Sequence, residues 1–241
     1  NISYLVSCLG SRPLDCYSTA DAADLRQWLV DKGLGNTSLQ RIFGVVKAVV
    51  NFSIKEQGLD CKNAFSGVYL PSEVNKKRLP IKEAKLKQLQ KECIHLDDDI
   101  RWLVALISDT GMRLSEAVGL LIDDLVIDAQ QPYVNLIAHP HRRLKTDSSE
   151  RVIPLVGSSL WAAQRIKQTQ NSSFCFERYC DTHNCNSNSA SAAINKWIKT
   201  IAGTEAVIHG FRHGFRDRLR AVEAPVDMID QLGGWSLRSV G

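Results

Sequence analysis

Residues 208–219 read IHGFRHGFRDRL and place five basic side chains beside two phenylalanines. At about 100° per residue, the apolar side chains recur on one helix face, as a buried stripe does. That face carries Phe211, Phe215, Leu219 and Val222, and a second face carries His209, Arg212, His213 and Arg216. Arg212 lies where the two faces meet, so apolar side chains partly enclose its charge. Taken alone, the run is typical of a solvated basic face, and other stretches must decide whether it has a function.

The composition indicates an ordered protein that can bind a polyanion. The chain has 241 residues, of which 44% are hydrophobic and 23% charged, and its formal net charge is +4. This balance excludes a disordered tail and permits, without requiring, an acidic partner. No apolar run is long enough to span a membrane. The seven cysteines are odd in number and lack a framework spacing, which favours a reducing cytosol.

The sequence predicts two domains joined by a basic linker. Residues 1–72 contain helical patterns over 18–33, which Ser18 or Thr19 can cap, and over 36–58. The second pattern carries Arg41 and Lys47 off its apolar stripe. Residues 73–82 are polar and are assigned to the linker. Its basic residues are Lys76, Lys77 and Arg78.

Residues 83–241 predict a larger domain that is mainly α with a small antiparallel β-sheet. Helical patterns cover 82–93, 96–111 and a short stretch after it, and they return after residue 157. Gly111 is expected to end the second of these helices. Between them, 133–138 and 151–155 are rich in β-branched residues and predict strands. The segment that joins the two strands contains Arg142, Arg143 and Lys145.

Three basic stretches follow one another in this domain, and each has an ordinary structural interpretation. Arg113, in DTGMRLSEAVGL, has the spacing of an ion pair with Glu116. Lys145 resembles an edge-strand lysine that blocks aggregation. Trp235, in LGGWS, is of a type usually found in cores.

Together, the stretches resemble the tyrosine recombinases, or phage-type integrases. The family motif TGxRxSE is matched at residues 110–116, and the hairpin lysine before RVxPL is matched by Lys145 and 151–155. The HxxRH motif is matched at 209–213, and the LGH/W position at 232–235 with one additional glycine. The resemblance implies an integrase-type catalytic domain over 83–241. By position, 1–72 resembles the helical, SAM-like core-binding domain, and the two domains would form a clamp on duplex DNA.

The resemblance also implies a function and a role for each residue. The protein would be a site-specific recombinase that breaks and rejoins DNA through a 3′-phosphotyrosine, for integration or excision of a mobile element. Arg113 and Arg212 would bind the scissile phosphate, His209 would assist proton transfer, and Lys145 would protonate the leaving 5′ oxygen. Trp235 would donate its indole N–H, and Glu116 and His213 would support these groups. DNA contacts are expected from Arg41, Lys47, Lys76, Lys77, Arg78, Arg142 and Arg143.

The partners expected from the resemblance are double-stranded DNA and further copies of the chain. The working unit would be a tetramer on two DNA sites in the cytoplasm of a prokaryotic cell or phage host, associated with the nucleoid. No cofactor and no metal are expected, because a phosphotyrosyl link conserves the energy of the broken bond.

The sequence departs from the family at the nucleophile. The family places a tyrosine shortly after the LGH/W position, whereas the tyrosines here are Tyr4, Tyr17, Tyr69, Tyr133 and Tyr179. We expect the nucleophile beyond Gly241, roughly nine residues after Trp235. Residues 1–241 are therefore expected to bind DNA without forming a covalent adduct.

Three other interpretations fit the sequence less well. Cys175, Cys180, His183 and Cys185 have the spacing C-x₄-C-x₂-H-x-C, which differs from common zinc modules. A non-catalytic helix-turn-helix repressor would have no use for a hairpin lysine. A type IB topoisomerase shares the phosphate chemistry, but the short chain and the small N-terminal helical domain favour a recombinase.

Overall fold

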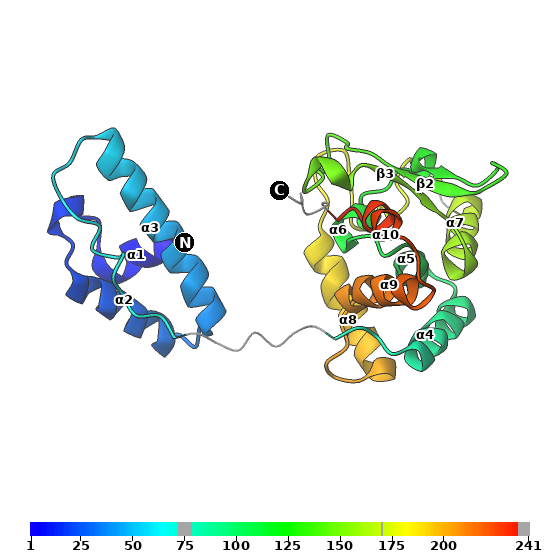
Figure 1. The fold of residues 1–241 in the computed structure, drawn as a ribbon, viewed down its shortest axis with the longest axis horizontal. Helices are drawn as coiled ribbons and strands as arrows, with labels where there is room; N and C mark the ends of the chain where they lie inside the picture. The colour runs from blue at the N-terminus through cyan, green and yellow to red at the C-terminus, as the bar shows by residue number, and fades with distance from the viewer. Residues whose placement is uncertain (72–78, 170, 236–241) are drawn as a thin grey trace. The chain divides into compact units, whose positions relative to one another are not determined.

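The computed structural model describes residues 1–71, 79–169 and 171–235, and the chain divides into two compact units (Figure 1). Unit 1 is Asn1–Lys76 and unit 2 is Lys77–Gly241. Each unit has its own hydrophobic core. Among the described residues, no helix is long and apolar enough to cross a membrane.

The described part of unit 1 contains three α-helices, α1 (Ile2–Leu9), α2 (Thr19–Asp31) and α3 (Asn36–Glu56). Ser18 caps α2: its Oγ accepts a hydrogen bond from the Asp21 N–H, and the Asp21 carboxylate accepts one from the Ser18 N–H. This cap was anticipated from the sequence, whereas α1 was not. Arg41 is exposed on α3, and Lys47 is half-buried on the same helix.

Unit 2 is mainly helical, and α5 (Asp99–Thr110) runs through its core. Eight of the twelve α5 residues are buried, because the helix packs against others on several sides. The other helices are α4 (Glu83–Leu96), α6 (Leu114–Val118), α7 (Gly157–Thr169), α8 (Ser187–Ala202), α9 (His209–Ala221) and α10 (Val226–Gly233). Asp98 caps the N-terminus of α5 by accepting a hydrogen bond from the Arg101 N–H.

A three-stranded antiparallel sheet lies at one side of these helices (Figure 1). Its strands are β1 (Leu125–Val126), β2 (Tyr133–Leu136) and β3 (Arg151–Pro154), in the order β1-β2-β3. Burial alternates along β3, so Arg151 and Ile153 point inward. The predicted class, mainly α with a small antiparallel sheet, is confirmed.

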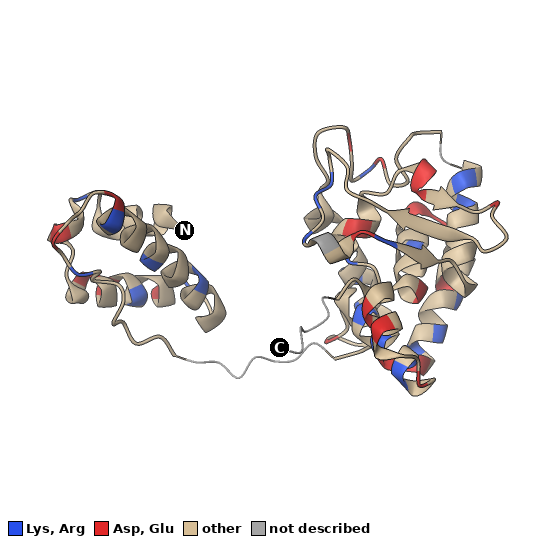
Figure 2. Ribbon diagram, turned by 45° about the horizontal axis from the view of Figure 1, so that its top comes forward, with Lys and Arg blue, Asp and Glu red and all other residues tan. Residues whose placement is uncertain are grey.

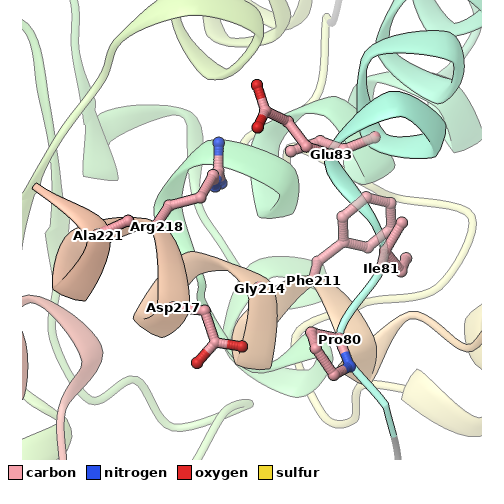
Figure 3. Close-up of a pocket in the computed structure, with 9 residues that line it drawn as sticks. Pro80, Ile81, Glu83, Phe211, Gly214, Asp217, Arg218 and Ala221 are labelled. Atoms are coloured by element: carbon pink, nitrogen blue, oxygen red, sulfur yellow. The ribbon is translucent and has the colours of Figure 1, made fainter.

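Residues 79–82, which the sequence analysis assigned to the linker, are packed onto α9. The Ile81 N–H donates to the Gly210 carbonyl at 3.4 Å, and the Ile81 side chain belongs to the core of unit 2. A Cβ on Gly210 would lie 3.0 Å from the Leu79 carbonyl oxygen, so the glycine permits this close approach. A pocket of about 230 Å³ opens beside the segment, between α4 and α9, where Ile81 and Phe211 form part of its wall (Figure 3).

Gly111 fixes the end of α5 against α9, and we expect Gly111→Ala to destabilise unit 2 by about 2–4 kcal/mol. Gly111 has φ +62°, and an added Cβ would lie 2.5 Å from Cδ1 of Phe215. The substitution therefore combines a left-handed backbone with a clash in the core. Chemical denaturation measures the change in the free energy of unfolding.

Gly58→Ala is the matched control for this change. Gly58 has φ +59°, close to that of Gly111, and a Cβ there would meet no atom within 4 Å, so the variant reports backbone strain alone. Equal destabilisation of the two variants would show that the contact with Phe215 contributes nothing.

Candidate functional site

A buried carboxylate organises the residues that the sequence analysis singled out. Glu116, 3% exposed, lies in the first turn of α6, so its side chain folds back to accept from the Arg113 N–H at 2.9 Å. It also accepts from Arg113 Nη1 at 2.5 Å and from Arg151 Nη2 at 3.0 Å. Burial opposes ionisation, but Arg151 and Arg113 outweigh it, so the pKa of Glu116 lies below its ordinary value.

Arg113 connects α6 to two other parts of unit 2. Its Nη1 also donates to Ser149 Oγ at 3.1 Å, and its Nη2 donates to the Gly234 carbonyl at 3.3 Å. The side chain remains 23% exposed. Arg113 is therefore both held by the protein and open to a ligand.

Arg212, on α9, is 3% exposed and hydrogen-bonds to backbone carbonyls. Its Nη1 donates to the Gly111 carbonyl at 2.7 Å and its Nη2 to the Gly233 carbonyl at 2.5 Å. Burial, followed by repulsion from Arg113, lowers the pKa of Arg212 to about 9. The guanidinium stays protonated at neutral pH, but its charge is incompletely compensated.

Trp235 covers this part of the site. Its ring lies 4.4 Å from the Arg212 guanidinium carbon and 4.8 Å from that of Arg216, both cation–π contacts. The ring also passes directly over Gly233, where a Cβ would overlap it. The LGGW sequence thus places a residue without a side chain, Gly233, directly under the tryptophan ring. The indole N–H contact with phosphate remains a prediction.

Arg151 is a site residue that the sequence analysis missed. Besides Glu116, it donates from Nε to the Leu232 carbonyl at 2.9 Å and from Nη1 to the Ser149 carbonyl at 2.7 Å. It therefore joins β3 to α10 and to the loop before β3. The sequence signal that could have identified Arg151 is its charge at an inward-facing position of a predicted strand. Charged side chains are buried only when they have partners, so such a position indicates an ion pair.

The two histidines of the HxxRH motif contact each other on α9. The ring centroids of His209 and His213 are 4.9 Å apart, with the rings at 81°. His209 is half-buried at the first residue of the helix, whereas His213 is exposed. His209 lies one turn before Arg212, on the same side of α9.

Lys145 is exposed in the loop between β2 and β3. In the described parts of the chain, no hydrogen bond or ion pair joins Lys145 to Arg113, Arg151 or Arg212. Its neighbour Thr146 is connected, because Thr146 Oγ1 lies 3.0 Å from Ser149 Oγ, which accepts from Arg113. The hydroxyl groups of Thr146 and Ser149 thus connect the loop that carries Lys145 to Arg113.

The prediction that Arg142 contacts DNA is wrong in this structure. Its side chain is 2% exposed, and its stem packs over Gly119, where a Cβ would lie 2.5 Å from Arg142 Cδ. Nη1 donates to the Glu116 carbonyl at 2.9 Å, and Nη2 donates to the Ile137 carbonyl. Burial lowers the pKa of Arg142. Unlike Arg212, which adjoins other arginines, Arg142 faces Asp124, 3.7 Å from its Nη2, so its charge is compensated and it supports the loop.

The other residues predicted to contact DNA are differently placed. Arg143 is exposed beside Lys145. Lys76, Lys77 and Arg78 lie outside the described residues. Basic and acidic side chains are interspersed on the helices of both units (Figure 2).

The arginine cluster, defined as Arg113, Arg151, Arg212 and Arg216, carries more positive than negative charge. Among the described residues, its carboxylate partners are Glu116 and Asp230, the latter 3.3 Å from Arg216 Nη2. Guanidinium groups present paired donors that match the oxygens of a phosphate. An anion at the cluster would relieve the repulsion among the arginines.

Solved structures that share this fold include integrases. The chain aligns with the Tn1549 transposon integrase in complex with circular intermediate DNA at 19% identity and a TM-score of 0.71, covering 99% of this chain and 84% of that one. A lambda integrase dimer bound to a COC′ core site aligns at 14% identity and a TM-score of 0.70, covering 99% of this chain and 83% of that one. A lambda integrase tetramer bound to a Holliday junction aligns at 17% identity and a TM-score of 0.71, covering 100% of this chain and 70% of that one. At these identities the likeness shows the fold.

The family model assigns the chain more directly than the solved structures do. Among curated proteins, no sequence matches the chain significantly. The model of the phage integrase family matches residues 80–240, a range that contains all four sequence motifs and the whole arginine cluster. The chain belongs to the phage integrase family.

Proposed function

We propose that this protein is a site-specific DNA recombinase that breaks and rejoins strands through a 3′-phosphotyrosine intermediate. The observation that carries the proposal is the arginine cluster, whose excess positive charge lies on the family's own motif residues. Such a site suits a phosphodiester, because the group gains charge on its non-bridging oxygens during transfer.

Arg113 and Arg212 are assigned to those non-bridging oxygens. Both are fixed before substrate binds, Arg113 by Glu116 and Arg212 by two carbonyls. Donors held in place in this way need not reorganise during the reaction, which is the basis of electrostatic catalysis. Trp235 keeps water from one side of Arg212 by covering its guanidinium.

Proton transfer is assigned to Lys145 and His209. Lys145 protonates the leaving 5′ oxygen, and its exposed position leaves the side chain accessible to DNA. The phosphotyrosyl link retains the energy of the broken bond, so rejoining needs no nucleotide. Neither tyrosine of unit 2 forms a hydrogen bond with the arginine cluster in the described residues. For residues 1–241 we therefore expect DNA binding without a covalent adduct.

The partners are duplex DNA and further copies of the chain. The related integrases are bound to DNA as a dimer at a core site and as a tetramer on a Holliday junction. We extend this arrangement to the present protein, with Arg41 and Lys47 of unit 1 and Arg143 of unit 2 contacting phosphates. The two units would hold the duplex as a clamp, in the cytoplasm of a prokaryotic cell and associated with the nucleoid.

Affinity for duplex DNA should fall steeply with salt, with a log–log slope of several units, because each contacted phosphate releases about one counterion. Fluorescence anisotropy with a labelled duplex measures this slope. Arg41→Ala and Arg143→Ala should each reduce it by about one unit. Arg142→Ala is excluded from this set, because its buried guanidinium supports the fold.

A matched control is Lys87→Ala, which removes an exposed cation paired with Glu83 on α4. It should leave the slope unchanged. A slope near zero for the unmodified protein would contradict the clamp. Strand exchange between two labelled recombination sites, measured with a polypeptide that includes the nucleophilic tyrosine, then tests recombination itself, since neither a simple DNA-binding protein nor a topoisomerase exchanges strands between them.

A further inference from the structure

Two cysteines and a histidine from different loops meet outside the arginine cluster. The ligand atoms of His141, Cys180 and Cys185 all lie within 4.8 Å of one another. His141 comes from the loop after β2, and the cysteines face each other across a tight hairpin closed by the Asp181 N–H to the Asn184 carbonyl, at 3.0 Å. Cys180 is 4% exposed, so the group lies at the edge of the core.

The surroundings of His141 fix its tautomer. Its Nε2 lies 3.0 Å from the Gly119 carbonyl oxygen, which can only accept, so Nε2 carries the proton. Nδ1 is therefore the ring atom with a free lone pair. Metal-ligating histidines show this arrangement, with the other ring N–H donated to a carbonyl or carboxylate. Phe174 and His139 hold the ring by an edge contact and a stack.

The two cysteines are joined as a disulfide in this structure. Disulfides are rare in a reducing cytosol, where a DNA recombinase works. Two equivalents of a cytosolic thiol reduce this bond by exchange, which gives two cysteine thiols and one external disulfide, and each cysteine then loses a proton on binding a metal. Two thiolates and one neutral imidazole form a donor set that suits Zn²⁺.

We propose that Cys180, Cys185 and His141 of the reduced protein bind one Zn²⁺ ion. The sequence analysis expected no metal because the spacing around Cys180 and Cys185 is unusual. His141 is distant in the sequence, so only the fold reveals it as the third ligand. The ion joins the 180–185 hairpin to the loop that carries Arg143 and Lys145, and so holds the base of that loop in place.

The experiment uses residues 1–241, reduced with a phosphine and freed of metal by a chelator. Zn²⁺ is titrated in competition with a chromogenic chelator, and Co²⁺ serves as a spectroscopic probe of thiolate ligands. We expect one ion per chain, a thiolate-to-cobalt band in the near ultraviolet, and protection of Cys180 and Cys185 from alkylation. His141→Ala should weaken binding more than about 100-fold, because even outer partners of a ligand account for about 10- to 100-fold.

The controls are Cys61→Ser and His95→Ala, which change residues outside this group and should leave the affinity unchanged. Circular dichroism shows that each variant is folded. The proposal is overturned if the reduced protein binds no zinc, if His141→Ala binds it as tightly as the unmodified chain, or if the Cys180–Cys185 disulfide persists in protein isolated from a reducing cytoplasm. None of these outcomes bears on strand exchange, so the proposed function is tested separately.

Discussion

Arg212→Lys should reduce the formation of covalent protein–DNA adduct by about 10²- to 10³-fold, the loss typical of removing one donor to a developing oxyanion. Lysine keeps the charge but cannot satisfy the two carbonyls of Gly111 and Gly233 and also present a fork to phosphate. The measurement uses a nicked duplex carrying the recombination site, with a polypeptide that includes the nucleophilic tyrosine. The amount of adduct is expressed per folded molecule, and the folded fraction of each protein is taken from its thermal melting curve.

Arg165→Lys is the matched control. Arg165 lies on α7 and pairs with Asp97, with its side chain 33% exposed, so the same chemical change occurs away from the cluster. Adduct formation should be unaffected there. If Arg212→Lys formed adduct at the normal rate per folded molecule, Arg212 would be a structural residue and not a phosphate ligand.

Glu116→Gln should lower the free energy of unfolding by about 3–5 kcal/mol, as expected when one partner of a buried ion pair is removed. The amide side chain has nearly the same shape as the carboxylate, but Arg113 and Arg151 would lose the negative charge between them. Urea denaturation at neutral pH measures the change. Glu83→Gln, at an exposed pair with Lys87, should change stability by less than about 1 kcal/mol.

The pH dependence gives a second measurement on the same variant. Because the pKa of Glu116 is lowered in the folded state, its contribution to stability is present above the ordinary carboxyl pKa of about 4.3 and is lost as pH falls through the lower folded value. The difference between the two proteins should therefore shrink in acid. A difference that stayed constant down to the folded pKa and below would show that the carboxylate charge is not the cause.

Features set by neighbouring residues could be predicted from the sequence. The Ser18 cap and the Gly111 stop depend on a few adjacent positions, and the structure contains both. The stripe on α9 was correct for Phe211 and Phe215 but wrong for Val222, which is 73% exposed. The helix ends at Ala221, so its period no longer applies one residue later.

Features set by packing between distant segments could not be predicted in this way. Arg142 and Arg151 are both basic residues near the same loop, and although the strand pattern placed Arg151 inward, no local pattern showed what either would contact. The structure buries both: Arg151 shares the Glu116 carboxylate with Arg113, whereas Arg142 donates to the Glu116 carbonyl. The contact between Trp235 and Gly233 likewise depends on how α10 ends. The motif residues were identified because the family resemblance supplied what local patterns lack.

The incomplete compensation of the arginine cluster has a thermodynamic consequence. Arg212 is a buried cation whose lowered pKa reports an environment that disfavours its charge, so folding without an anion is less favourable than it would otherwise be. Any phosphate group that binds the folded site alone stabilises the fold, by about 2.7 kcal/mol at 100 times its dissociation constant. The melting temperature is then a property of the protein together with its buffer, and DNA acts as a folding ligand as well as a substrate.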